Sequence, residues 1–305
     1  MQRDPRELGG AWRAAQRHAF DVPSADLAPY VERYWSVRWR YERPYRQLIV
    51  PLPNVHLSFR DGHAELHGPS SSHVFRELTG AGSVFGVAFR PGMFRPFLGG
   101  PVAGLRDRMV DAATVFGADT PTVADHASVE RFLRAHLPDP DPRACLAAEV
   151  VAAIAADPTV TRVDVLAERY GLTVRGLQRL FADCVGIGPK WVVRRYRLHE
   201  ITERLAAGVA VDWAGIAAEL GYADQAHLSR EFRRIFGEPP TSYALRYERR
   251  PVERGEQALS EVAKGRCSRS ARLADTGAED AADARDEQPE PEVEASGRVG
   301  GVVQW

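Results

Sequence analysis

Arginine side chains are predicted to face outward from two short helices in the second half of the sequence. In GYADQAHLSREFRRIF (221–236) the apolar residues recur at i, i+4, i+7 and i+8 and form one stripe: Leu228, Phe232, Ile235 and Phe236. At about 100° per residue, Arg230 lies about 200° from Leu228, opposite this stripe, and Arg179 has the same relation to Leu177. An outward arginine can form two hydrogen bonds with a guanine in the major groove of DNA. The predicted chemistry is therefore base recognition, and no nucleotide-binding loop, catalytic-triad motif or CxxC points to an enzyme.

An internal repeat positions these arginines. Residues 166–186 (LAERYGLTVRGLQRLFADCVG) align with residues 216–237 (IAAELGYADQAHLSREFRRIFG). Each copy predicts a short helix, a glycine turn, a capping residue (Thr173 or Asp224) and a second helix, which together form a helix-turn-helix unit. For one copy a plain helical hairpin is an equal alternative, but the repetition favours DNA binding. A helix predicted over 189–207 joins the units, and its span of about 28 Å is close to the ~34 Å between successive major-groove faces.

Residues 143–250 resemble the DNA-binding domain of the AraC/XylS family of bacterial transcription regulators. The resemblance covers both units, the helix between them and the closing GEPPTSYALRY (237–247). It implies a sequence-specific DNA-binding transcription regulator whose two second helices enter adjacent segments of the major groove. It also implies base contacts by these residues: Arg175, Gln178, Arg179, Gln225, Ala226 and Arg230, with His227 and Ser229 beside them. Ala226 departs from the family pattern, because a polar residue often occupies this position; it could contact only a thymine methyl group.

Four further arginines are predicted to contact phosphates, which add affinity and salt dependence without reading the base sequence: Arg194, Arg195, Arg233 and Arg234. At the places of the last two, the first unit has Ala182 and Asp183, and a carboxylate facing DNA would repel phosphate. The second unit is therefore expected to be the stronger backbone anchor. The predicted core residues of this region are Leu177, Phe181, Cys184, Trp191, Leu228 and Phe232.

The region before the helices is predicted to be rich in β-strands. RQLIVP (46–51), VHLSFR (55–60) and SVFGVAF (83–89) have the length and composition of strands, and Asp61-Gly62 is a hairpin signal. A short helix is expected near GMFRPFLGG (92–100), a longer one at 126–136, and a linker at PDPDP (138–142). AraC/XylS proteins often carry a cupin-like β-barrel that senses a ligand or dimerises, and VFGVAFRPGMFRPFLGGP (84–101) resembles a poorly characterised subgroup of these sensors.

The predicted fold class is therefore α+β with several domains. Residues 1–140 form a β-rich, cupin-like sensor or dimerisation domain, residues 143–250 form the all-α domain with two helix-turn-helix units, and residues 251–305 form a disordered acidic tail. The charges agree with this division, since residues 160–250 hold 15 basic and 11 acidic side chains, whereas residues 255–305 hold 6 and 11. The three scattered cysteines, the polar N-terminus and the lack of a long apolar run predict a cytoplasmic protein without a membrane partner.

Four histidines in the β-rich region leave one alternative open: His56, His63, His67 and His73. A barrel could gather them around a metal ion, although we expect no metal and no cofactor. The leading prediction is a regulator that binds double-stranded DNA and responds to a small-molecule effector. RNA polymerase and a second copy of the chain are further candidate partners. The alternatives are a cupin-like metal enzyme fused to a DNA-binding domain, and a regulator controlled by a protein partner.

Overall fold

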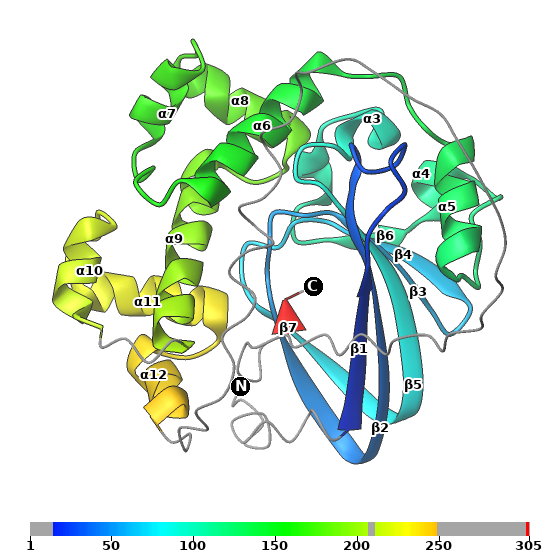
Figure 1. Ribbon diagram of the computed structural model, residues 1–305, viewed down its shortest axis with the longest axis horizontal. Helices are drawn as coiled ribbons and strands as arrows, with labels where there is room; N and C mark the ends of the chain where they lie inside the picture. Colours follow the sequence, from blue (N-terminus) through cyan, green and yellow to red (C-terminus); the bar gives the residue numbers. More distant parts are fainter. Residues whose placement is uncertain (1–14, 207–210, 249–302, 305) are drawn as a thin grey trace, which may run out of the picture. The chain divides into compact units, whose positions relative to one another are not determined.

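The computed structural model describes residues 15–206, 211–248 and 303–304 (Figure 1). The first part forms one sheet, whose strands pair antiparallel in the order β1-β2-β5-β3-β4-β6. Their bounds are β1 (Gln16–Asp21), β2 (Val31–Val50), β3 (His56–Arg60), β4 (His63–His67), β5 (Val74–Phe89) and β6 (Met109–Asp111). A short strand, β7 (Val303–Gln304), pairs parallel with the end of β2. The rest of the predicted disordered tail, residues 251–302 and 305, lies outside the described residues.

The predicted strands are present, but two of them are much longer than expected. β2 has 20 residues and β5 has 16, and the predicted segments 46–51 and 83–89 are only the ends of these strands. The two strands pair from Val31↔Phe89 to Ile49↔Val74, with an irregularity between Tyr41 and Tyr45. The hairpin prediction is confirmed: Asp61 and Gly62 join β3 to β4 with φ values of 51° and 77°, the conformation of a tight two-residue turn.

Side chains alternate between the two faces of this sheet, as the strand geometry requires. On β3, Leu57 and Phe59 belong to a buried apolar core, while His56 and Ser58 point to the opposite face. The apolar core is completed by residues from and around four short elements: α3 (Arg95–Leu98), η1 (Val102–Leu105), α4 (Ala113–Phe116) and α5 (His126–Ala135). The helices predicted near 92–100 and over 126–136 correspond to α3 and α5.

The second part is all helical, as predicted. Its helices are α6 (Pro142–Ala156), α7 (Val163–Arg169), α8 (Val174–Cys184), α9 (Pro189–Ala206), α10 (Trp213–Glu219), α11 (Gln225–Phe236) and α12 (Pro240–Glu248). α7 and α8 form the first helix-turn-helix unit, α10 and α11 form the second, and α9 joins them. Gly171 and Gly221 lie in the two turns with φ values of 64° and 70°, which side chains other than glycine rarely adopt.

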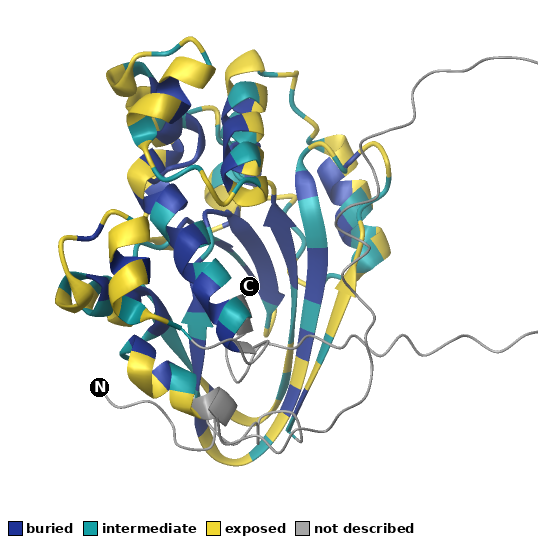
Figure 2. Ribbon diagram, turned by 60° about the vertical axis from the view of Figure 1, so that its left-hand side comes forward, coloured by how far each residue is buried: buried dark blue, intermediate teal, exposed yellow. Residues whose placement is uncertain are grey.

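Two apolar cores hold these helices, and in Figure 2 the helices show buried and exposed sides. One core joins α6, α7 and α8 to the first half of α9. The other joins α10, α11 and α12 to the second half of α9, and it also includes Leu48 and Val50 of β2. The predicted core residues are all buried, from Leu177 at 0% exposed to Trp191 at 8%. The described residues between 15 and 248 belong to one compact unit, so the sheet and the helices share contacts.

Candidate nucleic-acid interface and ligand pocket

The second helix of the first unit, α8, has one buried and one exposed side. Thr173 caps it, because its side-chain oxygen accepts a hydrogen bond of 3.0 Å from the backbone N–H of Gly176. The apolar side is buried in the core: Leu177, Leu180, Phe181 and Cys184. The residues expected to contact bases are all exposed: Arg175, Gln178 and Arg179. The helix therefore offers two guanidinium groups and one amide to a partner, next to its N-terminus.

The second helix of the second unit, α11, repeats this arrangement. Asp224 caps it with a hydrogen bond of 2.6 Å from the backbone N–H of His227. Its apolar stripe is fully buried: Leu228, Phe232, Ile235 and Phe236. Gln225, Ala226 and Arg230 are exposed, whereas His227 and Ser229 are half-buried. The His227 ring packs edge-on against Tyr222, with 5.1 Å between the centroids, so this histidine also supports the turn.

Three of the four predicted phosphate-binding arginines reach the surface to different degrees. Arg233 and Arg234 are exposed in the last turn of α11. Arg194 is half-buried on α9, and its guanidinium lies 3.9 Å from the Glu231 carboxylate and over the Tyr222 ring. Arg194 therefore links α9 to the second unit and is less available for a phosphate than the two arginines of α11.

Arg195 requires a correction, because its side chain is fully buried and cannot contact DNA. Its Nε donates a hydrogen bond of 2.6 Å to the carbonyl oxygen of Pro51, and the guanidinium lies over the Phe236 ring. Burial lowers the pKa of Arg195 to about 10. The helix spacing carries the signal that was missed: position 195 is three residues from both Val192 and Leu198, and so it lies on the buried side of α9.

The Asp183 carboxylate does not face outward, so it is not placed to repel a DNA phosphate. Its carboxylate lies 3.0 Å from Arg95 Nε and 2.7 Å from Arg143 Nη1, so two guanidinium groups neutralise it. Arg95 also forms an ion pair of 2.5 Å with Asp141, the N-cap of α6. This network ties α8 to α3 and to the start of α6, and no local sequence pattern predicts it.

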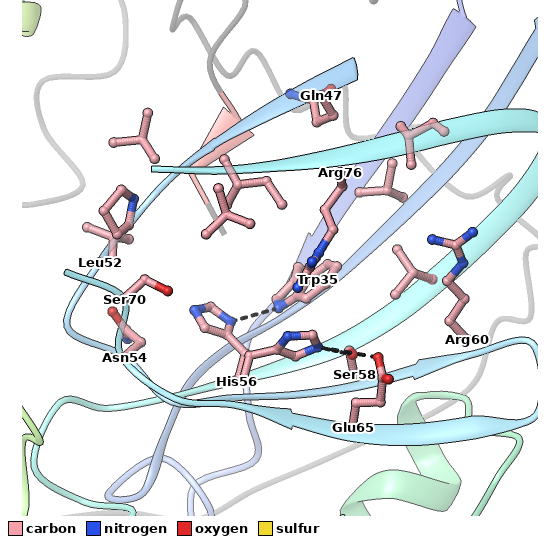
Figure 3. A pocket seen from close by; sticks show the side chains of 18 of the residues that line it. Trp35, Gln47, Leu52, Asn54, His56, Ser58, Arg60, Glu65, Ser70 and Arg76 are labelled. Carbon is pink, nitrogen blue, oxygen red and sulfur yellow. Dashed lines mark hydrogen bonds and ion pairs between the residues drawn. The ribbon is translucent and has the colours of Figure 1, made fainter. Parts of the chain in front are cut away.

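A cavity of about 170 Å³ opens on the polar face of the sheet (Figure 3). Its walls are mostly apolar and include two indole rings, those of Trp35 and Trp39 on β2. Both rings lie directly on β5: a Cβ atom added to Gly86 would be 2.2 Å from the Trp35 ring, and one added to Gly82 would be 2.4 Å from the Trp39 ring. The two glycines therefore make room for a flat aromatic wall, which the sequence prediction missed.

The polar part of the cavity is supplied mainly by β3, β4 and β5. These strands contribute six polar side chains to the lining: His56, Ser58, Arg60, Glu65, His67 and Arg76. Figure 3 labels five of them, all but His67. The Trp35 Nε1–H donates to His56 Nδ1 at 3.3 Å, and Ser58 Oγ lies 2.7 Å from His67 Nε2. Burial, together with the charge of Arg76, lowers the pKa of His67 to about 4. The imidazole of His67 is therefore neutral at physiological pH and can exchange hydrogen bonds with a ligand.

The four histidines considered for a metal site do not come together. His56 and His67 are direct cross-strand partners and both line the cavity. His63 is exposed at the hairpin, and His73 donates a hydrogen bond of 2.8 Å from Nδ1 to the carbonyl oxygen of Arg234. Among the residues that the structure describes, no group of three or more histidine, cysteine or acidic side chains is arranged to hold a metal ion.

Comparison with known families decides the assignment of the helical part. Residues 166–246 match the model of a helix-turn-helix domain of the AraC type, and the match extends from α7 to α12. The chain is an AraC-family transcription regulator. In this AraC-family regulator, residues 21–111, which hold most of the sheet, match a domain of unknown function, DUF6597. The predicted family, the predicted fold class and DNA binding are confirmed.

Solved structures of other regulators show only distant similarity to this AraC-family chain. ToxT from Vibrio cholerae is 9% identical with a TM-score of 0.36, over 76% of this chain and 98% of ToxT. The C-terminal domain of AraT from Geobacillus stearothermophilus is 20% identical with a TM-score of 0.30, over 37% of this chain and 92% of that domain. CdpR from Pseudomonas aeruginosa is 18% identical with a TM-score of 0.27, over 55% and 47%.

Comparison with curated proteins found no match to the AraC-family chain. Across residues 15–206 and 211–248, none of its helices combines the length and the apolar character needed to cross a bilayer.

Proposed function

We propose that this AraC-family regulator reads DNA with α8 and α11 and that a small molecule in the sheet cavity controls this binding. The observation that carries the proposal is the pair of capped helices, each with a buried apolar stripe and an exposed arginine two residues after its first buried leucine. We call α8 and α11 the recognition helices. Their proposed base contacts are Arg175, Gln178, Arg179, Gln225, Ala226, His227, Ser229 and Arg230, and the strongest readers are Arg179 and Arg230, because arginine bonds guanine at two atoms.

The length of α9 supports simultaneous binding of both recognition helices. It has 18 residues, which span about 27 Å at ~1.5 Å per residue. Successive major-groove faces of DNA lie ~34 Å apart. A stiff helix of this length can therefore hold the two recognition helices against one side of a duplex. The proposed phosphate contacts are Arg233 and Arg234, with a smaller contribution from Arg194; the buried Arg195 is not one of them.

The size and walls of the cavity favour a small, mostly apolar and flat ligand. A buried cavity of ~150 Å³ is known to hold a benzene molecule in another protein, and the cavity here is of similar volume, about 170 Å³. The Trp35 and Trp39 rings offer stacking surfaces, while Ser58 and the neutral His67 offer hydrogen bonds. We therefore propose an effector with one or two rings and a polar group at one end.

The remaining parts of the proposal concern organisation and partners. Residues 1–140 act as the sensor, residues 143–250 as the DNA-binding domain and residues 251–305 as a tail. The regulator acts in the cytoplasm, and RNA polymerase and a second copy of the chain are its proposed protein partners. We assign no catalytic step, and the elemental content of the purified chain tests the enzyme alternative: stoichiometric iron, manganese or zinc would favour it.

Binding of the full chain to DNA as a function of salt tests the proposal. The logarithm of the association constant should fall linearly with the logarithm of the salt concentration, with a slope of about 0.9 for each phosphate contacted. Arg233→Ala should weaken cognate and unrelated duplexes about equally and reduce the slope by about one. Arg162→Ala is a matched control, because Arg162 is exposed but forms an ion pair with Asp164. Binding to random duplex that does not depend on salt would contradict the proposal.

A further inference from the structure

Two segments next to the cavity have a double role. The first, residues 47–52, covers the end of β2 and the loop after it, and the second, residues 68–76, leads into β5. Gln47 and Ile49 line the cavity, whereas Leu48 between them is fully buried in the core of the second helix-turn-helix unit. Val50 belongs to both, since it lines the cavity and packs in that core. Along this strand, residues that line the cavity are therefore covalent neighbours of residues that pack in the core of the second unit.

Direct polar contacts run from these two segments to α9 and α11. Arg195 on α9 donates to the carbonyl oxygen of Pro51 at 2.6 Å, and Pro51 itself lines the cavity. His73 donates to the carbonyl oxygen of Arg234 twice, from its backbone N–H at 3.1 Å and from Nδ1 at 2.8 Å. A carbonyl group in the last turn of a helix has no partner within the helix, so His73 satisfies the end of recognition helix α11.

Packing at the end of α11 is equally close. A Cβ atom added to Gly237, the C-cap of α11, would lie 3.1 Å from Leu48 and 3.6 Å from His73. Phe75, one residue before the cavity-lining Arg76, packs against the same core. Close-packed interiors transmit small displacements instead of absorbing them. A shift of either segment by a fraction of an ångström would therefore move the C-terminal end of α11.

The first unit also meets the sheet region, partly through the second segment. Gly186, just after α8, packs against Val102 and against Pro69 of that segment, and Asp183 forms its ion pair with Arg95. Trp191 Nε1, at the start of α9, donates a hydrogen bond of 3.0 Å to the carbonyl oxygen of Ser71 in the same segment. The difference lies in the cavity wall itself: Val50 lines the cavity and packs in the core of the second unit, and Pro51 lines it and binds Arg195, whereas Val102, Pro69, Arg95 and Ser71 do not line it.

We infer that a molecule in the cavity changes DNA recognition through α11 more than through α8. This inference rests on the proposed function and adds an asymmetry to it: the effector acts mainly on one half of the bound DNA. A coupling between two sites of this kind commonly changes affinity about 5- to 150-fold. The coupling elements are residues 47–52 and 68–76, and His73 and Arg195 are positioning residues that do not touch the DNA.

A covalent probe tests the inference without knowledge of the effector. Val84 lines the cavity and is half-buried, so Val84→Cys can be labelled with benzyl methanethiosulfonate in a Cys145→Ser, Cys267→Ser background of the full chain. The remaining Cys184 is buried, and burial raises its pKa to about 11, which protects it from the reagent. Ser83→Cys, labelled in the same way, is the matched control, because Ser83 is exposed and does not line the cavity.

The readout is the affinity for three duplexes. The first is selected from a random library; in the second the block of bases read by α11 is scrambled, and in the third the block read by α8 is scrambled. We expect the label at Val84→Cys to change affinity about fivefold or more, and most of this effect should be lost when the block read by α11 is scrambled. Scrambling the block read by α8 should leave most of the effect in place. His73→Phe should remove most of it, whereas exposed His63→Phe should not. Arg76→Cys is the second labelling position if Val84→Cys does not fold.

Hydrogen exchange of the labelled chain gives an independent measurement. The label should change exchange more in residues 225–236 than in residues 174–184. An equal or larger change in residues 174–184, an effect on affinity that depends mainly on the α8 block, or no effect of a label that mass spectrometry shows to be attached would overturn the inference. Failure of the proposed function is distinguishable, because in that case the unlabelled chain would select no DNA sequence at all.

Discussion

Replacing the buried Arg195 by methionine is expected to change the free energy of unfolding by no more than about 1 kcal/mol. Burial lowers the pKa of this guanidinium from 12.5 to about 10, which corresponds to about 3 kcal/mol against the charged form in the folded state. Methionine removes that penalty. It also removes the hydrogen bond to Pro51, worth about 1.5–3 kcal/mol for a charged donor, and the contact with the Phe236 ring, so the gains and losses nearly cancel.

A truncated variant provides the contrast. Arg195→Ala removes the same charge and the same hydrogen bond, but it also leaves a cavity between α9, α11 and the end of β2, and large-to-small changes in a core commonly cost about 2–5 kcal/mol. Neither Nη1 nor Nη2 of Arg195 has a hydrogen-bond partner among the described residues, so methionine leaves few polar groups unsatisfied. The expected order of stability is therefore wild type close to Arg195→Met, and both well above Arg195→Ala.

Urea unfolding followed by circular dichroism and tryptophan fluorescence measures these differences. The two signals should change together and the slope with urea should be equal in the three proteins, so that the midpoints report stability. A loss of about 3 kcal/mol or more in Arg195→Met, with Arg195→Ala no worse, would refute the reasoning. Such a result would mean that the guanidinium stabilises the fold by more than its burial costs.

Three further predictions concern the cavity and a helix cap. Gly86→Ala should displace the Trp35 ring, because the new Cβ would lie 2.2 Å from it; we expect a loss of about 1–3 kcal/mol and a shifted fluorescence spectrum. The pKa of His67 is about 4 in the folded chain and 6.5 ordinarily, so its contribution to stability is full above pH 6.5 and is lost as the pH falls towards 4; His67→Gln should reduce the slope of stability against pH in this interval by up to about 1.4 kcal/mol per pH unit in urea titrations. Asp224→Ala removes the cap of α11 and should cost about 1 kcal/mol, whereas exposed Glu219→Ala, measured in the same way, should cost much less.

The helix-turn-helix units could be predicted because their signals are local. Each unit shows its apolar period, its turn glycine and its cap within about 20 residues of sequence, and the structure has all three in both copies. The exposed arginines followed from the same period. The side of a helix that faces its own core is set mainly by the spacing of nearby apolar residues. The sequence can therefore predict which residues of these helices are buried by their own unit and which are exposed.

The features that were missed depend on contacts between distant segments. Alternating polar residues in HLSFR and HAELH mark one face of β3 and β4, but only the strand order shows that β2 and β5 complete a cavity there. The prediction that Arg195 contacts phosphate is wrong for a related reason. Its spacing from Val192 and Leu198 places it on the buried side of α9, but its hydrogen-bond partner is the end of β2, more than 140 residues earlier in the chain, and no local pattern encodes that contact.

The most direct test of DNA reading by two recognition helices is selection of preferred sites by three full-length proteins from one randomised duplex library. The wild-type chain should select two blocks of bases about one helical turn apart. Arg179→Ala should lose preference in one block and Arg230→Ala in the other, each at a cost of about 1–3 kcal/mol in affinity for the selected site. If both variants lose preference at the same base pairs, or lose affinity with no change in preference, the two helices do not read adjacent segments of the major groove.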